Sequence, residues 1–209
     1  MKEEIAVKKS SLVIIASVIL VVVVASTFIF LPKPHIETEA HSSDTLTAKF
    51  ALLSKAGTNF CAGPDILERV QGDRLQGACC SAMDFHRYAE QVEGLKKYSH
   101  IDKIPPDPYD IPRSLAEELL DYQKTIQLTP EQQAVYDEAM QMSHEGGPCC
   151  CKCWRWYAFE GQAKYLITEY NFDSEQIAEV WDLEDGCGGS GHEGHGDGHA
   201  EREEFEPQN

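Results

Sequence analysis

The sequence predicts an all-α protein, with an N-terminal transmembrane helix followed by a compact, cysteine-rich helical ectodomain. Three observations lead to this fold class. A run of 20 uncharged residues, Leu12–Leu31, is almost entirely apolar. Later segments carry apolar residues at helical spacing and begin with helix-capping residues. No segment alternates apolar and polar residues over the length of a strand, so we expect no sheet.

The apolar run is long enough to cross a hydrocarbon core of about 30 Å. Lys2, Lys8 and Lys9 precede it, and the positive-inside rule then places the N-terminus in the cytoplasm. We predict a cytoplasmic segment at 1–10, a membrane-spanning signal anchor at 11–31, and an extracytoplasmic remainder. A cleaved signal peptide is the alternative, but its apolar region usually spans only about 7 to 15 residues.

The expected elements of the first half follow in order along the chain. Residues 32–44 are polar with two prolines and predict a stalk, and the main domain is expected at 45–187. Apolar spacing and capping residues predict helices at 44–55, 64–70 and 75–98. The prolines of 104–108 predict an extended connector.

The second half shows clearer helix starts. Thr129-Pro130 places a capping residue before a proline at the first helical position, and Asp173 precedes another acidic first turn. We predict helices at 112–126, 129–142, 152–170 and 173–185. Residues 188–209 are rich in glycine, acid and histidine, which predicts a disordered tail whose histidines would hold metal weakly.

Net charge limits the partners. The chain has 18 Lys and Arg against 35 Asp and Glu, a net charge of −17. An acidic surface repels nucleic acid and attracts cations, so we predict no nucleic-acid partner.

Eight cysteines supply the strongest chemical signal, and four of them fall within five positions. The crowded set is Cys149, Cys150, Cys151 and Cys153, whereas Cys61, Cys79, Cys80 and Cys187 lie elsewhere. Neighbouring thiols can barely pair with one another, because a disulfide needs Cα atoms about 4.4 to 6.8 Å apart. They either pair with distant cysteines or hold a metal. An even count in an exported domain also fits disulfide staples.

Residues near the cysteines favour the metal interpretation. On the predicted helix 75–98, Cys79, Met83 and His86 fall at i, i+4 and i+7, with Cys80 beside them. Thiolate, thioether and imidazole on one helical face are ligands that suit Cu(I), and Zn(II) accepts the thiolates and the imidazole. The alternative is that Met83 packs in the core and His86 is a surface residue.

His144 leads into the cysteine cluster, which lies at a predicted helix start, where backbone N–H groups favour the thiolate. The predicted ligands are Cys79, Cys80, His86, His144, Cys149, Cys150, Cys151 and Cys153, holding one or two ions of Cu(I) or Zn(II).

The segment Pro148–Cys153 reads PCCCKC and resembles the P-C-x-C-x-C core of the exported bacterial family named for its PCYCGC motif. The order of the surrounding elements from about 104 to 182 is also similar. Cys150 and Lys152 replace the Tyr and Gly of the motif. The resemblance implies an exported, membrane-tethered protein that binds metal through Cys149, Cys151 and Cys153. It implies no established activity, so it bears on location and chemistry more than on role.

Together these patterns predict a membrane-anchored, extracytoplasmic protein that captures, buffers or delivers a soft metal. Motifs for covalent haem, nucleotide phosphate, serine hydrolysis and zinc proteolysis are absent from the sequence, so it leans away from an enzyme. Two alternatives stay open. One is a disulfide-stapled domain that binds a membrane or exported protein. The other is a thiol-disulfide oxidoreductase that uses Cys150 and Cys153.

Overall fold

The computed structural model describes residues 38–188, and the chain divides into two units between Ser43 and Asp44. The predicted membrane segment at 11–31 and the tail from 189 onward lie outside the described residues. Within 38–188, no helix has the length and apolar character needed to span a bilayer.

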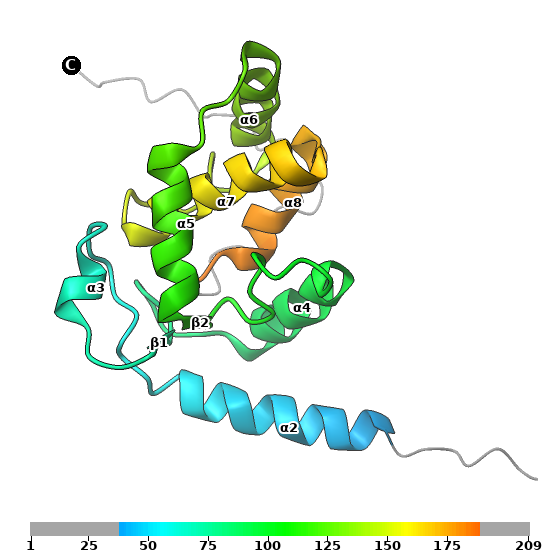
Figure 1. Cartoon of the computed structure of the whole chain (residues 1–209). Helices are drawn as coiled ribbons and strands as arrows, with labels where there is room; N and C mark the ends of the chain where they lie inside the picture. The colour runs from blue at the N-terminus through cyan, green and yellow to red at the C-terminus, as the bar shows by residue number, and fades with distance from the viewer. Residues whose placement is uncertain (1–37, 189–209) are drawn as a thin grey trace, which may run out of the picture. The chain divides into compact units, whose positions relative to one another are not determined.

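The described part is mostly helical, as the sequence predicts (Figure 1). Each helix overlaps a predicted one, and the largest difference is in the predicted helix 75–98. The helices, in chain order, are α2 (Thr38–Leu53), α3 (Ile66–Arg69), α4 (Phe85–Leu95) with the 3₁₀ turn η1 (Lys96–Tyr98), α5 (Arg113–Thr125), α6 (Pro130–Met142), α7 (Trp154–Tyr170) and α8 (Ser174–Glu184).

Local capping explains two of the clearest helix starts. The Thr129 side chain accepts from the backbone N–H of Gln132, and the Gln132 side chain accepts from the backbone N–H of Thr129. Asp173 and Gln176 form the same reciprocal pair at the start of α8. Each pair satisfies backbone donors that the first helical turn leaves without partners, so both starts could be predicted from sequence.

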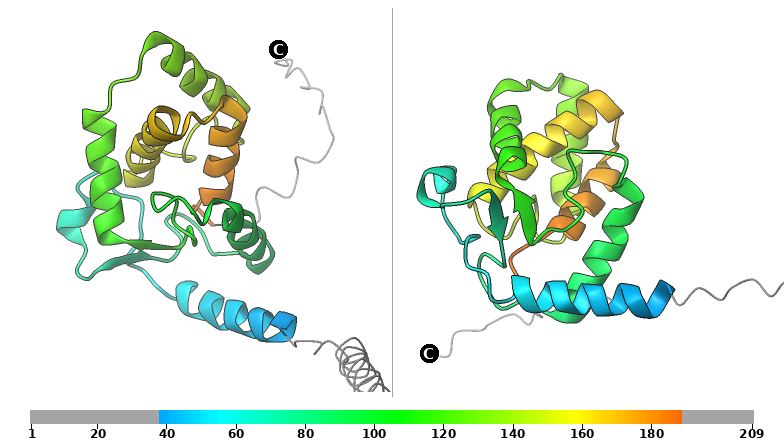
Figure 2. Two further views of the ribbon diagram at one scale, coloured as in Figure 1. Left: turned by 45° about the vertical axis from the view of Figure 1, so that its right-hand side comes forward. Right: turned by 60° about the horizontal axis from the view of Figure 1, so that its bottom comes forward.

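Helix α7 is central to the domain, with α5, α6 and α8 around it (Figure 2). Its buried face includes Trp154, Phe159 and Leu166. The closest approach is to α5 at Gly161, where an added Cβ would lie 2.6 Å from the backbone nitrogen of Gln123 and closer still to the carbonyl oxygen of Leu119. Only glycine lets the two helix backbones come this close.

Helix α8 packs against α6 and α4 on the other side of this core. The Trp181 indole meets the Tyr136 ring edge to face, with centroids 5.4 Å apart. At the α4 contact, an added Cβ on Gly94 would collide with the Leu183 side chain. These contacts fix the C-terminal end of α8, and therefore the position of the residues that follow it.

The predicted helix 75–98 is wrong in its first half. Residues Arg74–Gln76 form strand β1, a loop covers 77–84, and α4 begins only at Phe85. Gly77 has φ +94°, a left-handed conformation that ends any regular element there. Asp84 then caps α4 by accepting from the backbone N–H of Arg87. Cys79, Met83 and His86 therefore do not share a helical face.

A two-stranded antiparallel sheet is the second departure from the all-α prediction. Strand β1 pairs with β2 (Asp110–Pro112), and Leu75 lies opposite Ile111. Each strand has three residues, which is too short for an alternating pattern to register in the sequence. A third departure is at the predicted stalk 32–44, because α2 already begins at Thr38.

Candidate metal centre

All eight cysteines of the chain are described, and they gather from four segments that are distant in sequence. Cys61 precedes α3, and Cys79 and Cys80 lie in the loop before α4. The residues Cys149–Cys153 connect α6 to α7, and Cys187 follows α8. All eight are thiols. The assembly of these segments is the main feature that the sequence alone does not reveal.

Cys187 is at the centre of the sulfur contacts. Its Sγ lies 2.9 Å from that of Cys150, 3.3 Å from that of Cys149 and 3.6 Å from that of Cys79. Cys149 in turn lies 3.7 Å from Cys153. One sulfur therefore has three sulfur neighbours, more than a single disulfide would use.

The sulfurs form overlapping groups of three, within which every sulfur lies less than 4.8 Å from the others. One group has two exposed thiols and one half-buried thiol, one is fully buried, and two combine buried and exposed thiols. The groups are Cys61–Cys80–Cys151, Cys79–Cys149–Cys153, Cys79–Cys80–Cys187 and Cys149–Cys150–Cys187. Several sulfurs belong to two groups, which is the arrangement needed for thiolates that bridge neighbouring ions.

These spacings suit thiolate coordination. With a metal–sulfur distance of about 2.3 Å, neighbouring sulfurs stand about 3.8 Å apart around a tetrahedral ion and about 4.0 Å apart around a planar three-coordinate ion. The sulfur–sulfur contacts of 2.9 to 3.7 Å are all shorter, so outward movements of the side chains, largest for Cys150 and Cys187, would reach this geometry.

Backbone hydrogen bonds join the loop before α4 to the segment after α8. The amide of Cys79 donates to the carbonyl of Gly186 at 3.1 Å. The amides of Cys80 and Ser81 both donate to the carbonyl of Cys187, at 3.3 and 2.9 Å. The amide of Cys187 donates to Asp185 Oδ1 at 3.1 Å. These bonds bring the Cys79 and Cys187 thiols into contact.

Asn59 connects three of the cysteine-bearing segments. Its side chain is buried, donates to the carbonyl of Gly77 at 2.7 Å, and accepts from the Trp154 indole N–H at 3.0 Å. The amide of Trp154 also donates to the carbonyl of Ala62 at 2.7 Å. Asn59 thereby fixes the loop of Cys61 against both the loop of Cys79 and the start of α7.

Cys153 is the N-cap of α7, and the other cysteines of its cluster lie in the loop before it. The partial positive charge of a helix N-terminus stabilises a thiolate placed there. Two left-handed glycines, Gly146 with φ +67° and Gly147 with φ +150°, allow the chain to turn into this loop. A side chain on Gly147 would collide with Trp156 and Met140.

A fully buried cation lies beside the sulfurs. The guanidinium of Arg155 donates to the carbonyls of Pro108 and Glu184 and lies 4.8 Å from the centroid of the Phe159 ring. Burial opposes its charge, but attraction to the sulfurs of Cys79, Cys149 and Cys187 outweighs this and raises its pKa. The positive charge of Arg155 would therefore stabilise thiolates at Cys79, Cys149 and Cys187.

Crowding makes the thiols unequal as acids. Hydrogen bonds from Cys153, Cys187 and Cys79 lower the pKa of Cys149, so this thiol ionises first. Hydrogen bonds to Cys149 raise the pKa of those three partners, and burial raises that of Cys150 to about 11. The group thus favours one thiolate, and further ionisation requires a cation that offsets the added negative charge.

The predicted ligands separate into two sets. The structure brings together Cys79, Cys80, Cys149, Cys150, Cys151 and Cys153. It does not bring either predicted histidine to them: within 38–188, no close group of metal-capable side chains contains a histidine. His86 is 79% exposed and pairs with Glu90 at 3.1 Å, and His144 contacts Asp182 at 3.5 Å.

Sequence reasoning left Cys61 and Cys187 out of the ligand set, yet each lies within a group of three. No local motif marks either residue. The only signal in the sequence was the number of cysteines. Eight cysteines in two sets of four favour a single site that includes all of them over a site that uses only six.

The sequence matches no model of a known protein family, and comparison with curated proteins and with solved structures finds no match. The resemblance to the PCYCGC family remains a prediction.

Proposed function

We propose that this chain is a membrane-anchored, extracytoplasmic protein that binds a soft metal ion through its clustered thiols, with Cu(I) as the first candidate and Zn(II) as the second. It captures, buffers or delivers the ion. The apolar segment 11–31 supplies the anchor, and the acidic surface attracts cations toward it.

The contacts of Cys187 are the observation that carries this proposal. Its sulfur meets those of Cys79, Cys149 and Cys150 within 3.6 Å. A disulfide network needs sulfurs in pairs, whereas a metal ion needs three or four sulfurs directed to one point. The overlapping groups of three have the second arrangement.

The donor set favours Cu(I) over Zn(II). Every member of the four groups is a cysteine, and soft thiolate ligands select Cu(I) and Zn(II) over harder ions. Zinc prefers four tetrahedral ligands, whereas the groups here contain three sulfurs and share members. Shared thiolates bridge Cu(I) ions readily, so eight sulfurs in four groups support a cluster of more than one ion.

Arg155 supports an anionic cluster of this kind. Thiolates outnumber the charges of the ions that they would bridge, so the cluster carries net negative charge. A buried charge is stable only when it is paired, and the Arg155 guanidinium is already in place beside Cys79, Cys149 and Cys187.

The test is elemental analysis with a parallel thiol count on the full chain in detergent, purified without oxygen. His192, His195 and His199 are replaced by alanine so that the tail does not contribute. We expect more than one copper per chain, and we expect most of the metal to be lost in Cys187→Ser. Cys187→Ser that retains the full metal content, or a chain with neither metal nor free thiols, would contradict the proposal, and the second result would establish disulfide staples.

A further inference from the structure

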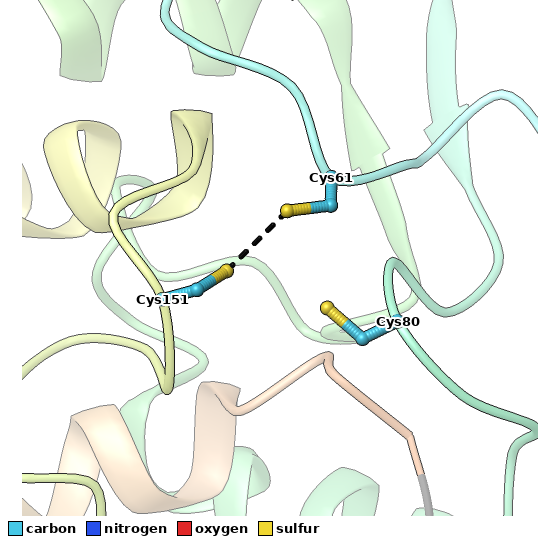
Figure 3. A group of neighbouring side chains, drawn as sticks. All are labelled: Cys61, Cys80 and Cys151. Carbon is cyan, nitrogen blue, oxygen red and sulfur yellow. Dashed lines mark hydrogen bonds between the residues drawn. The ribbon is translucent and has the colours of Figure 1, made fainter.

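The four thiol groups differ in their access to solvent, and this difference follows a spatial order. Cys61 and Cys80 are exposed and Cys151 is half-buried, whereas Cys79, Cys149 and Cys153 are all buried. Figure 3 shows the outer three, which come from three different loops and direct their sulfurs toward one another. The Cys61 and Cys151 sulfurs are 3.5 Å apart.

The outer and inner groups are connected through one residue. Cys80 belongs to the outer group and also to the group of Cys79 and Cys187. Its sulfur lies 3.3 Å from that of Cys79, and the Cys79 sulfur lies 3.6 Å from that of Cys187. Sulfurs therefore continue without interruption from the surface to the most buried part of the cluster.

We infer that Cys61, Cys80 and Cys151 form an exchange site, which takes Cu(I) from a soluble copper–thiolate complex and passes it through Cys80 to the buried sulfurs. This inference rests on the proposed function and assigns different roles to the outer and inner thiols. The outer group exchanges ions with donors, and the inner group retains them.

The chemistry requires only ligand exchange. At each step one copper–sulfur bond forms to the incoming cysteine and one breaks to the outgoing thiolate, and copper stays in the +1 state throughout. The proton that the incoming cysteine releases is taken up by the departing donor thiolate. No oxidant or reductant enters the balance.

Burial explains why exchange would begin at the outer group. A donor thiolate complex must contact the accepting sulfur during exchange, and Cys79, Cys149 and Cys153 have relative exposures of 9%, 1% and 2%. Cys61 and Cys80 are open to such a donor and belong to one group, whereas Cys150 is the single exposed thiol of a group whose other two members are buried. Once inside, the ion gains the sulfurs around Cys187 and the neighbouring charge of Arg155, so inward transfer is favourable.

Stopped-flow uptake of Cu(I) from its glutathione complex by the full chain in detergent tests this order, with the tail histidines replaced as above. Cys61→Ser is compared with Cys150→Ser, since both remove one exposed thiol but Cys150 belongs only to the group of Cys149 and Cys187. We expect Cys61→Ser to slow uptake about tenfold or more while the inner ions are still bound at equilibrium, because a ligand is lost from the exchange step alone. We expect Cys150→Ser to lower the copper content at an unchanged initial rate.

Uptake by Cys61→Ser at the wild-type rate, or slow uptake in Cys150→Ser alone, would overturn the exchange site without affecting the proposed function. Absence of bound copper in the wild-type chain would instead remove the proposed function. A second measurement needs no variant: after less than one Cu(I) per chain is mixed in, samples are alkylated at increasing times. The three outer thiols should be protected at the earliest times and should become reactive again as the ion passes to the buried sulfurs. Outer thiols that stay reactive throughout uptake would overturn the inference even if Cys61→Ser does not fold.

Discussion

The α5–α7 contact and the sulfur cluster are both buried in the same domain, but they are held together by different means. Helices α5 and α7 meet through continuous apolar faces and the close approach at Gly161. The cluster is made of four loops joined by a few backbone hydrogen bonds and by Asn59. The helices therefore form a frame held by a large apolar contact and by side-chain hydrogen bonds such as that from Lys164 to the carbonyl of Gln123, whereas the loops are held by only a few hydrogen bonds.

The largest effect is expected from Gly161→Ala, which disturbs the packing of α7 against α5. The new methyl group would meet backbone atoms of Leu119 and Gln123, which cannot move aside as a flexible side chain could. We expect the free energy of unfolding to fall by about 3 kcal/mol or more. Thermal and denaturant unfolding measure this loss, and Gly57→Ala is the matched control because nothing lies within 4 Å of its added Cβ. Equal stability of the two variants would show that α5 and α7 are not closely packed.

The next effect is a pH dependence at Glu184, which lies between the frame and the cluster. Burial raises the pKa of Glu184 to about 8, although a hydrogen bond from Gln162 and the charge of Arg155 oppose this. The folded state then holds a proton that the unfolded state releases near pH 4.5, so its contribution to stability is complete below about pH 4.5 and is lost as pH rises through about 8.

Glu184→Gln should abolish this loss, because glutamine keeps the oxygen that accepts from Gln162 and cannot ionise. The variant should therefore gain stability relative to the wild type between pH 4.5 and pH 8.5, by a few kcal/mol. Denaturant unfolding at both values measures the difference. A difference between the two proteins that does not change with pH would contradict the shifted pKa.

Asn59→Ala tests the cysteine-bearing loops separately from the helical frame. It removes two buried hydrogen bonds and leaves the carbonyl of Gly77 and the indole N–H of Trp154 without their partner. We expect a loss of about 2 kcal/mol in the free energy of unfolding, together with weaker metal retention because Cys61, Cys79 and Cys153 lose their shared anchor. Gln123→Ala is the control, since its side chain makes a weaker contact of 3.4 Å to Glu160, which lies near the middle of α7. Full metal retention in Asn59→Ala would show that the loops hold their positions independently.

Metal removal should affect the loops and leave the frame nearly unchanged. After chelation under reducing conditions, we expect faster hydrogen exchange at the amides of Cys79, Cys80 and Ser81, because thiolates no longer hold that loop to Cys187. The amides in the centres of α5 and α7 should keep their protection. Uniform acceleration across the domain would show that metal and frame fold as one unit.

The smallest effect is expected from His86→Ala. The imidazole is exposed and pairs only weakly with Glu90 on the same helix, so stability should change by less than about 0.5 kcal/mol and metal content should not change. Elemental analysis provides the check. Loss of metal in this variant would restore His86 as a ligand and would require a different arrangement of the loop before α4.

The accuracy of sequence-based prediction differs between these two regions for a physical reason. Helices α6 and α8 begin where predicted, because their capping residues act within one turn and are visible in a few consecutive letters. Apolar spacing also predicted a helix across 77–84, but this segment is a loop. Gly77 has a left-handed conformation, and the amides of 79–81 donate to the carbonyls of 186 and 187. Histidines near cysteines in sequence were predicted as ligands, and the structure does not place them with the sulfurs.

By itself the sequence determined the helical class, the ends of most helices, the acidic charge and the presence of a dense thiol motif before α7, since each of these depends on neighbouring residues or on simple counts. Only the tertiary structure decided that Cys61 and Cys187 join that motif, that Arg155 supplies a buried charge beside it, and that the outer and inner thiols are connected through Cys80. These features depend on contacts between residues up to 108 positions apart. Such contacts are set by how the helices pack, and no local pattern of side chains encodes them.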